Sequence, residues 1–357
     1  MLQQPDPLVQ PRPHPARRRW LVDASAWHPA EGEVAWLAGL LPPEDAAAVA
    51  AFRFEDDRKR AVVSRLLARR CCADALGLPW GAVAIKRTRG RKPFCANTGG
   101  DRGAAPNFNF NVSHEGDYVL LASEPLAIVG VDVAAPQQLR RGGRGAGAAG
   151  AAEARPLLEA LAAFRGQLSA EEWRRLQSLH PDEAAIEAAF QQAWGAKEAY
   201  VKARGDGLGF EPMSRIHVDV LAAGEGGGGG GADGAAGGVV IASGVASGHG
   251  GGAGGGGGGA AAGGALEARL TVDGAPRPRW RVHVQSLPRR HWAAVALAPP
   301  EEVVDAFAEF TATLRRPVIS DADMAALLAL PPQPFELLCV GDLLPPDLAA
   351  DYEDRFG

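Results

Sequence analysis

Residues 107–133, NFNFNVSHEGDYVLLASEPLAIVGVDV, decide how the chain is organised, because they hold strand patterns in succession and end with an acid inside a hydrophobic strand. In the last strand the pleat places three core residues on one face: Val129, Val131 and Val133. The other face carries Gly130 and Asp132, and the glycine predicts room for a ligand beside the carboxylate. A buried carboxylate needs a hydrogen bond, a charged partner or a metal. The alternative is a strand-end acid that reaches solvent or caps a turn.

Composition places the chain among water-soluble globular proteins. It has 357 residues, 46% of them hydrophobic, which is enough for one large domain or two modest ones. The formal net charge of −5 argues against nucleic acid as the main partner, while local basic clusters still suit a small polyanion. The four cysteines match no zinc or disulfide spacing, so we expect a reducing, cytoplasmic location. Because no run of about 18 apolar residues occurs, we expect no membrane span.

Three parts of the chain differ from the rest. Residues 1–18 are rich in Pro and Arg and read as a disordered tail, with an organelle transit peptide as the weaker alternative. Residues 224–264 hold 23 of the 46 glycines and are expected to form a flexible insertion between strands. Residues 299–357 form a C-terminal extension, in which we expect an amphipathic helix at 301–314 and an apolar run, PFELLCVGDLL, that packs back on the body.

The remaining sequence repeats one order of elements. Residues 19–125 predict a strand at 19–27, a long helix within 43–76 and strands at 83–88, 108–114 and 118–123. Residues 126–298 predict a strand at 128–133, a helix at 184–202 and four strands, at 216–221, 266–272, 280–285 and 292–297. We therefore expect two similar α+β subdomains in one chain, a monomeric pseudo-dimer with its active site in the crevice between the halves.

The segment FQQAWGAKEAYVKARGDGLGF, residues 190–210, carries the second candidate acid. Phe190, Trp194, Glu198 and Lys202 follow one side of a helix at four-residue spacing. An apolar row that ends in charges predicts first turns in the core and last turns at a polar cleft. The alternative is a solvated Glu–Lys pair of little consequence for stability.

A basic turn and a short polar strand supply candidate anion ligands. The turn KRTRGRK contains five cations around one glycine, and it suits a ligand with several negative charges. Its residues are Lys86, Arg87, Thr88, Arg89, Gly90, Arg91 and Lys92. The strand NVSH adds Asn111, Val112, Ser113 and His114, where a hydroxyl and an imidazole suit phosphate oxygens. The alternatives are a solvated hairpin tip and an ordinary structural histidine.

Two carboxylates beside these cations suggest a magnesium site for a polyphosphorylated ligand, because Mg²⁺ is commonly held by one or two carboxylates, phosphate oxygens and water. Phosphoryl-type transfer is the chemistry that this set favours. A magnesium-dependent nucleotidyl transferase of another fold would share that chemistry, although it would not account for the doubled organisation.

The segments NFNFNVSHEGDYVLLASEP, GVDV and WGAKEAYVKARGDGLGF together resemble the signature of the 4′-phosphopantetheinyl transferases, in particular their single-chain, pseudo-dimeric type. The resemblance covers most of residues 19–298. It implies that coenzyme A binds in the crevice with Mg²⁺ on its pyrophosphate. It also implies that a serine of an apo carrier protein attacks the β-phosphate and releases adenosine 3′,5′-bisphosphate. The rival reading is an inactive coenzyme A-binding scaffold of the same fold.

The resemblance also implies roles for individual residues. Asp132 and Glu198 would be the metal ligands, Glu198 would also be the general base, and Lys202 would contact the pyrophosphate. The 3′-phosphate end of coenzyme A would be held by Arg87, Arg91, Lys92, Ser113 and His114. Neighbouring coenzyme A contacts would come from Thr88, Arg89, Gly90, Asn111 and Val112.

Two positions depart from the family pattern. Bacterial relatives have a second acid two residues after the aspartate, where this chain has Ala134. The family also has a basic residue early in the first long helix, where this chain has Asp56, so Arg58 or Lys59 is expected to take over that contact. The sequence does not indicate which carrier proteins are loaded, whether of fatty acid synthase, polyketide synthase or aminoadipate reductase type.

Overall fold

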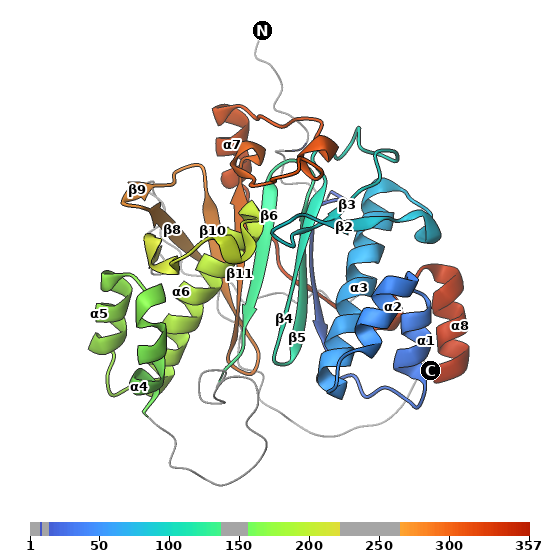
Figure 1. The fold of residues 1–357 in the computed structure, drawn as a ribbon, viewed down its shortest axis with the longest axis horizontal. Helices are drawn as coiled ribbons and strands as arrows, with labels where there is room; N and C mark the ends of the chain where they lie inside the picture. The colour runs from blue at the N-terminus through green and yellow to red at the C-terminus, as the bar shows by residue number, and fades with distance from the viewer. Residues whose placement is uncertain (1–7, 9–13, 137–155, 222–264) are drawn as a thin grey trace, which may run out of the picture.

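The computed structural model describes residue 8 and residues 14–136, 156–221 and 265–357 (Figure 1). The predicted insertion at 224–264 and most of the predicted tail lie outside these residues. None of the described helices combines the length and the apolar character that crossing a bilayer requires.

The first half is built on a four-stranded sheet in the order β12-β1-β5-β4. Its strands are β1 (Arg18–Asp23), β4 (Asn109–Glu115), β5 (Tyr118–Glu124) and β12 (Glu336–Leu338). The helices of this half are α1 (Glu33–Gly39), α2 (Pro43–Ala50) and α3 (Glu55–Leu76), and α3 packs on β4 and β5. The single helix expected within 43–76 is therefore two helices. Glu55, Asp56 and Asp57 fill the first turn of α3, where negative charge favours a helix start.

The second half is built on a six-stranded sheet in the order β6-β11-β10-β8-β7, with β9 paired to β8. Its strands are β6 (Ile128–Ala134), β7 (Ile216–Val220), β8 (Leu266–Val272), β9 (Ala275–Pro276), β10 (Arg281–Leu287) and β11 (His291–Ala298). Helix α6 (Glu183–Arg204) crosses β6 and β11, with α4 (Leu157–Leu161) and α5 (Ala170–Ser178) beside it.

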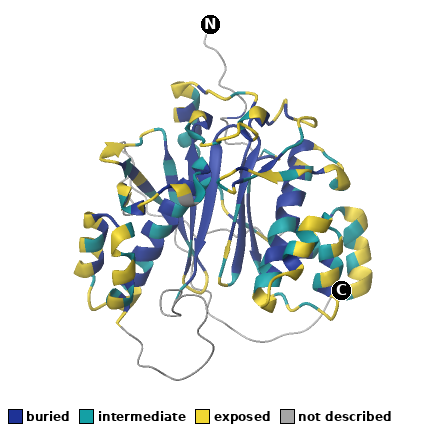
Figure 2. Cartoon of the chain, in the orientation of Figure 1, coloured by how far each residue is buried: buried dark blue, intermediate teal, exposed yellow. Residues whose placement is uncertain are grey.

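The two sheets lie side by side in the middle of the molecule, with α3 on one flank and α6 on the other (Figure 1). Alternating strand residues divide between cores, as the pleat requires. Leu120 and Val131 enter a core shared by the two sheets, whereas Leu121 faces the core under α3 and Ala296 the core under α6. The central strands β5, β6 and β11 are almost wholly buried, and the helices expose their outer faces (Figure 2). The prediction of two α+β subdomains in one chain is confirmed.

The C-terminal extension differs from the prediction in part. The helix expected at 301–314 is wrong, because the structure has only short 3₁₀ turns there: η6 (Pro300–Glu302) and η7 (Thr311–Thr313). Asp305 accepts hydrogen bonds from the backbone N–H groups of Phe310 and Thr311, both 2.8 Å, and such side-chain bonds compete with helix. Helices α7 (Asp321–Leu328) and α8 (Pro346–Phe356) follow. The apolar run does pack back on the body, since β12 pairs in parallel with β1.

Candidate active site

Helix α6 lies directly against β6 at Gly130. A Cβ atom at this position would overlap the backbone of Ala199 and Ala203 in α6. The space over Gly130 is thus filled by a helix, which corrects the expectation that this glycine makes room for a ligand. The close approach brings the last turns of α6, with Glu198 and Lys202, over the face of β6 that carries Asp132.

Asp132, Ser113 and Lys202 form a bonded cluster where the two halves meet. The Lys202 ammonium lies 2.5 Å from Asp132 Oδ1 and 3.0 Å from Ser113 Oγ, and the serine hydroxyl donates to the same carboxylate oxygen over 3.0 Å. Burial lowers the pKa of Lys202, but the charges of Asp132 and Glu198 outweigh that effect and raise the pKa overall. The lysine is therefore a fixed positive charge at this point of the crevice.

Glu198 and Glu115 complete an acidic neighbourhood around Asp132. Burial and the negative charge of Asp132 raise the pKa of Glu198. The same two causes raise the pKa of Glu115, at the end of β4, to about 7. No described groups of three His, Cys, Asp or Glu side chains form a complete protein cage for a metal. A divalent cation would relieve the mutual repulsion of these carboxylates. Their hard oxygen atoms fit Mg²⁺ that is held jointly by the protein, a ligand and water.

A cavity of about 1120 Å³ opens beside this cluster and is lined by both halves. Its walls include most of the predicted site residues: Arg87, Arg89, Gly90, Arg91, Lys92, Asn111, Val112, His114, Glu198 and Lys202. Thr88, Ser113 and Asp132 are buried next to it. An apolar section of the wall comes from Phe164, Trp194 and Phe210, so the cavity has one cationic and one aromatic side. The row from Phe190 to Lys202 therefore runs from core to cleft, as its pattern predicted.

The basic turn joins β2 (Ile85–Arg87) to β3 (Pro93–Cys95) and is closed by its own hydrogen bonds. Thr88 N–H donates to the Lys92 carbonyl over 2.9 Å, and Lys92 N–H donates to Thr88 Oγ1 over 3.2 Å. Arg91 adopts a φ of 67°, which costs a non-glycine residue conformational energy. A Cβ at Gly90 would overlap the backbone of Gly205, just past α6, so this glycine lets the turn of one half touch the other.

Lys92, one of the predicted phosphate ligands, also bonds to the second half. Its ammonium donates to the carbonyls of Val129 over 2.8 Å and Lys202 over 3.0 Å, and the residue is 3% exposed. Burial lowers the pKa of Lys92 to about 7. Two carbonyls of the second half thus occupy the ammonium, and the residue links the halves.

The helix α3 supplies cations that sequence reasoning missed. Arg65 and Arg69 line the cavity, whereas Lys59 is buried, with its ammonium 5.8 Å from the centre of the Trp27 ring. Asp56 lies in the first turn of the helix, away from the cavity wall. Arg65 is further down the helix than the expected Arg58 or Lys59. The two arginines are four residues apart in the sequence, and this spacing places them on the same face of a helix.

His114 lies at the cavity wall, where burial and the charges of Arg60 and Lys202 lower its pKa to about 4. A neutral imidazole still has one N–H to donate to an anion. Lys197, next to Glu198 in the same motif, has a structural position. Its ammonium is fully buried, 2.7 Å from Glu172 and bonded to the carbonyls of Gln167 and Met213.

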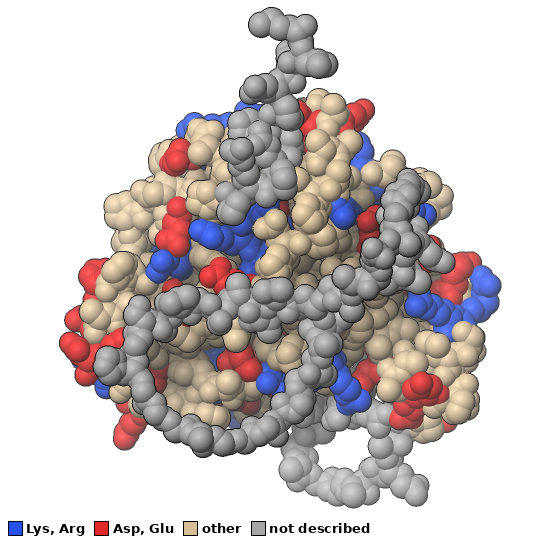
Figure 3. Space-filling model, turned by 180° about the vertical axis from the view of Figure 1, so that it is seen from behind, with Lys and Arg blue, Asp and Glu red and all other residues tan. Residues whose placement is uncertain are grey.

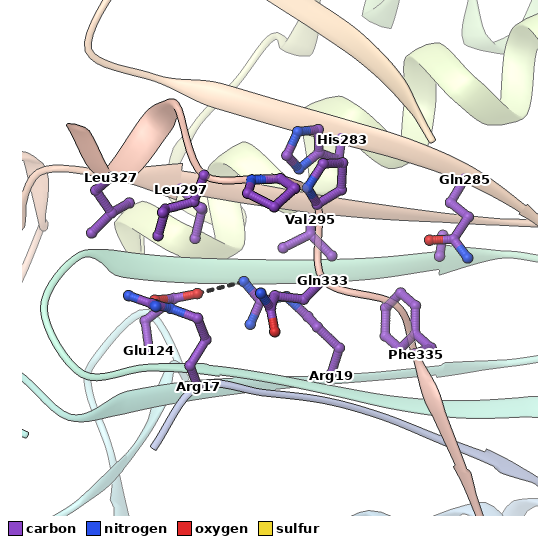
Figure 4. A pocket seen from close by; sticks show the side chains of 14 residues that line it. Arg17, Arg19, Glu124, His283, Gln285, Val295, Leu297, Leu327, Gln333 and Phe335 are labelled. Carbon is purple, nitrogen blue, oxygen red and sulfur yellow. Dashed lines mark hydrogen bonds and ion pairs between the residues drawn. The ribbon is translucent and has the colours of Figure 1, made fainter. Parts of the chain in front are cut away.

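A second cavity, of about 30 Å³, contains none of the predicted site residues (Figure 4). Arg17 and Arg19 both bind Glu124 there, and the partly buried His283 has its pKa lowered to about 3 by burial and nearby arginines. The volume suits one or two water molecules. Seen from behind, acidic and basic side chains of the described residues are interspersed over the surface (Figure 3).

Comparison with known sequences gives the same division into halves. Residues 25–126 match the family described as 4′-phosphopantetheinyl transferase, N-terminal, and residues 128–228 match the 4′-phosphopantetheinyl transferase superfamily. The two matches together cover more than half of the chain, which belongs to this superfamily. The resemblance of the sequence motifs is thus confirmed.

Individual relatives extend the similarity to eukaryotic proteins. An L-aminoadipate-semialdehyde dehydrogenase-phosphopantetheinyl transferase of Xenopus laevis is 36% identical over 57% of this chain and 61% of its own length. The Homo sapiens protein of that name is 27% identical over 79% of this chain and 75% of its own. A phosphopantetheinyl transferase of Thraustochytrium sp. is 34% identical over 56% and 64%. The chain thus spans about three fifths of the frog relative.

Proposed function

We propose that this protein transfers the 4′-phosphopantetheine group of coenzyme A to a serine of an apo acyl or peptidyl carrier protein. The observation that carries the proposal is the pairing of Asp132 and Lys202, with Glu198 nearby, at a cavity whose wall also carries several arginines. Coenzyme A carries a pyrophosphate, a 3′-phosphate and a long neutral arm. The cations suit its phosphates and the aromatic wall suits the arm.

In the proposed reaction the carrier serine oxygen forms a bond to the β-phosphorus of coenzyme A, and the bond from that phosphorus to the bridging oxygen breaks. Glu198 takes the hydroxyl proton, and its raised pKa makes it a stronger base. Adenosine 3′,5′-bisphosphate leaves with the bridging oxygen. Lys202 contacts the pyrophosphate and offsets the charge that develops there.

Asp132 and Glu198 would hold Mg²⁺ on the pyrophosphate. When bound, the ion neutralises phosphate charge and withdraws electrons from the reacting phosphorus. Arg65, Arg87 and Arg91 line the wall where the 3′-phosphate end of coenzyme A would lie. Since one chain supplies both sides of the crevice, the protein is proposed to act as a monomer, and its location is proposed to be cytoplasmic.

The test is to incubate the purified protein with coenzyme A, Mg²⁺ and a panel of apo carrier proteins of fatty acid synthase, polyketide synthase and aminoadipate reductase type. Mass spectrometry should show a phosphopantetheine adduct on the conserved acceptor serine of at least one carrier. A serine-to-alanine carrier is the control. If coenzyme A binds tightly but no carrier is modified, the protein is a coenzyme A-binding scaffold and not a transferase.

A further inference from the structure

The two halves are joined at their centre by side chains and not by strand pairing. Strands β4 and β6 belong to different sheets, and the side chains of β4 bond to backbone N–H groups of β6 and of Ala135, the residue that follows it. Four residues of β4 accept such bonds, each from the residue twenty positions later: Asn109 from Val129, Asn111 from Val131, Ser113 from Val133 and Glu115 from Ala135. The distances are 2.9, 2.9, 3.3 and 3.2 Å. We call this set the side-chain ladder.

Alternation along the strand explains the pattern. Residues two apart on β4 project to one face, and N–H groups two apart on β6 project to one edge. Alternate side chains of β4 can therefore each accept a hydrogen bond from one of these N–H groups. The intervening residue Phe110 projects instead into the core under α3. The constant offset of twenty residues means that a slip of one strand along the other would break all four bonds together.

Asn109 has the most complete rung. Its Oδ1 accepts from Val129 N–H over 2.9 Å, and its Nδ2 donates to the Ala127 carbonyl over 2.8 Å. One carboxamide thus makes both bonds that a peptide group of a neighbouring strand would make. The residue is 0% exposed and does not line the large cavity, so it cannot touch a ligand there.

The ladder fixes the candidate site because two of its rungs, Ser113 and Glu115, are part of it. Ser113 Oγ accepts from Val133 N–H while donating to Asp132 Oδ1. The position of β4 along β6 therefore sets where the hydroxyl and His114 of one half lie relative to the carboxylate of the other. Lys92 adds a further bond from the first half to the carbonyl of Val129.

We propose that Asn109 and Asn111 are positioning residues, whose side-chain bonds to β6 hold the phosphate-binding half in register with Asp132. Asn111 also lines the large cavity, so its side-chain bond to β6 stands beside the coenzyme A contact expected from the sequence. The predicted effect on kcat rests on the proposed function. The register of β4 against β6 is a property of the fold and does not depend on it.

The test uses variants that differ by one oxygen atom. Ser113 shows that a serine hydroxyl on β4 reaches a β6 N–H, so Asn109→Ser should keep the bond to Val129, whereas Asn109→Ala removes it. We expect Asn109→Ala to lower kcat on the order of 10- to 100-fold with little change in KM for coenzyme A, because misplacement affects the reacting geometry more than ligand affinity. Asn109→Ser should recover most of kcat.

Asn107 provides the matched control. It is also 0% exposed, and its carboxamide bonds to the backbone of Leu126 and Arg316, outside the ladder. Asn107→Ala should lower the melting temperature and leave kcat near the wild-type value. If Asn109→Ala does not fold, the isosteric pair Asn109→Thr and Asn109→Val replaces it, with the same expected difference.

A second readout separates this proposal from the proposed function. Binding of Mn²⁺ in the presence of coenzyme A can be measured by the loss of the EPR signal of the free ion. This measurement does not require the transfer reaction to occur. We expect Asn109→Ala to weaken Mn²⁺ binding about tenfold and Asn109→Ser to restore it. Wild-type kcat and wild-type Mn²⁺ binding in a folded Asn109→Ala protein would overturn the positioning role. A wild-type protein that modifies no carrier would refute the transferase and leave the Mn²⁺ comparison valid.

Discussion

At the residue scale, the candidate site depends on charges that the fold brings close. Asp132, Glu198 and Lys202 come from a strand and a helix separated by many residues, yet the ammonium lies 2.5 Å from the aspartate. The sequence predicted this trio from strand alternation and helical spacing. It did not predict Arg65 and Arg69 as cavity residues, because a helix with many arginines does not reveal which of them face a partner half.

The metal assignment predicts the behaviour of Asp132→Asn and Glu198→Gln. Each removes a hard anionic ligand and leaves the shape of the side chain, so both proteins should fold while transfer falls by about 100-fold or more. The stabilisation of coenzyme A-bound protein by added Mg²⁺ should also disappear in thermal unfolding. Asp273→Asn, at an exposed pair with Arg215, is the control. A folded Asp132→Asn variant with wild-type transfer would refute the metal role.

Lys92 predicts a pH dependence of stability. Its pKa is about 7 in the folded protein and 10.5 ordinarily, so between these values the unfolded chain binds the additional proton. The contribution of the residue to stability should therefore rise with pH between about 7 and 10.5 and level off below 7, where the lysine is protonated in both states. The measurement is urea unfolding of the wild type and Lys92→Met at pH 7, 8 and 9. A constant difference between the two would mean that the carbonyls keep the ammonium charged.

At the scale of elements, alternation and helical periodicity located β4, β5, β6, β8 and α6 well, because their apolar residues recur with the period of a strand or a helix. The prediction failed where local side-chain bonds compete with periodicity, as Asp305 does in the stretch expected to be helical. The sequence also misassigned Gly130. A glycine that faces a ligand and a glycine that faces a helix backbone give the same pattern in the sequence of a strand. Only the packing of α6 distinguishes the two cases.

Gly130→Ala should therefore damage both stability and activity. The new methyl group overlaps the backbone of α6, and such overpacking costs about 1–3 kcal/mol. The displaced helix should also lower transfer, because it carries Glu198. Gly195→Ala is the matched stability control, since its Cβ would lie an ordinary 3.5 Å from that of Ala294. Denaturant unfolding of both proteins measures the difference, and equal stabilities would show that α6 shifts without cost.

At the scale of the whole molecule, one chain forms two halves whose site exists only at their contact. The Lys92 bonds, the Gly90–Gly205 contact and the side-chain ladder all cross that contact. The C-terminal extension reinforces both halves, because Phe335 enters the core shared by the sheets while Val340 and Leu343 enter the core under α3. The doubled order of the sequence predicted the halves but not these contacts, which depend on residues far apart in the chain.

Two deletions should then have opposite results. Strands β7 and β8 pair up to Val220 and Ala268, and Leu221 N–H still donates to the Glu267 carbonyl over 2.9 Å. Replacing residues 224–264 with a short Gly/Ser turn should leave the melting temperature and transfer nearly unchanged, because the strand ends are already adjacent.

Truncation after residue 331 removes β12 and α8 together with Phe335, Val340, Leu343 and Leu344, all at most 4% exposed. Each fully buried apolar side chain of this size contributes roughly 1.5–3 kcal/mol, so the loss is comparable with the whole stability of a typical domain. The truncated protein should be insoluble or unfolded at 25 °C, although it retains every residue of the candidate site. The two deletion variants should be compared by their soluble yield and by thermal unfolding under the same conditions. A truncated protein with the wild-type melting temperature would mean that the extension only covers the surface and that the two halves hold their contact without it.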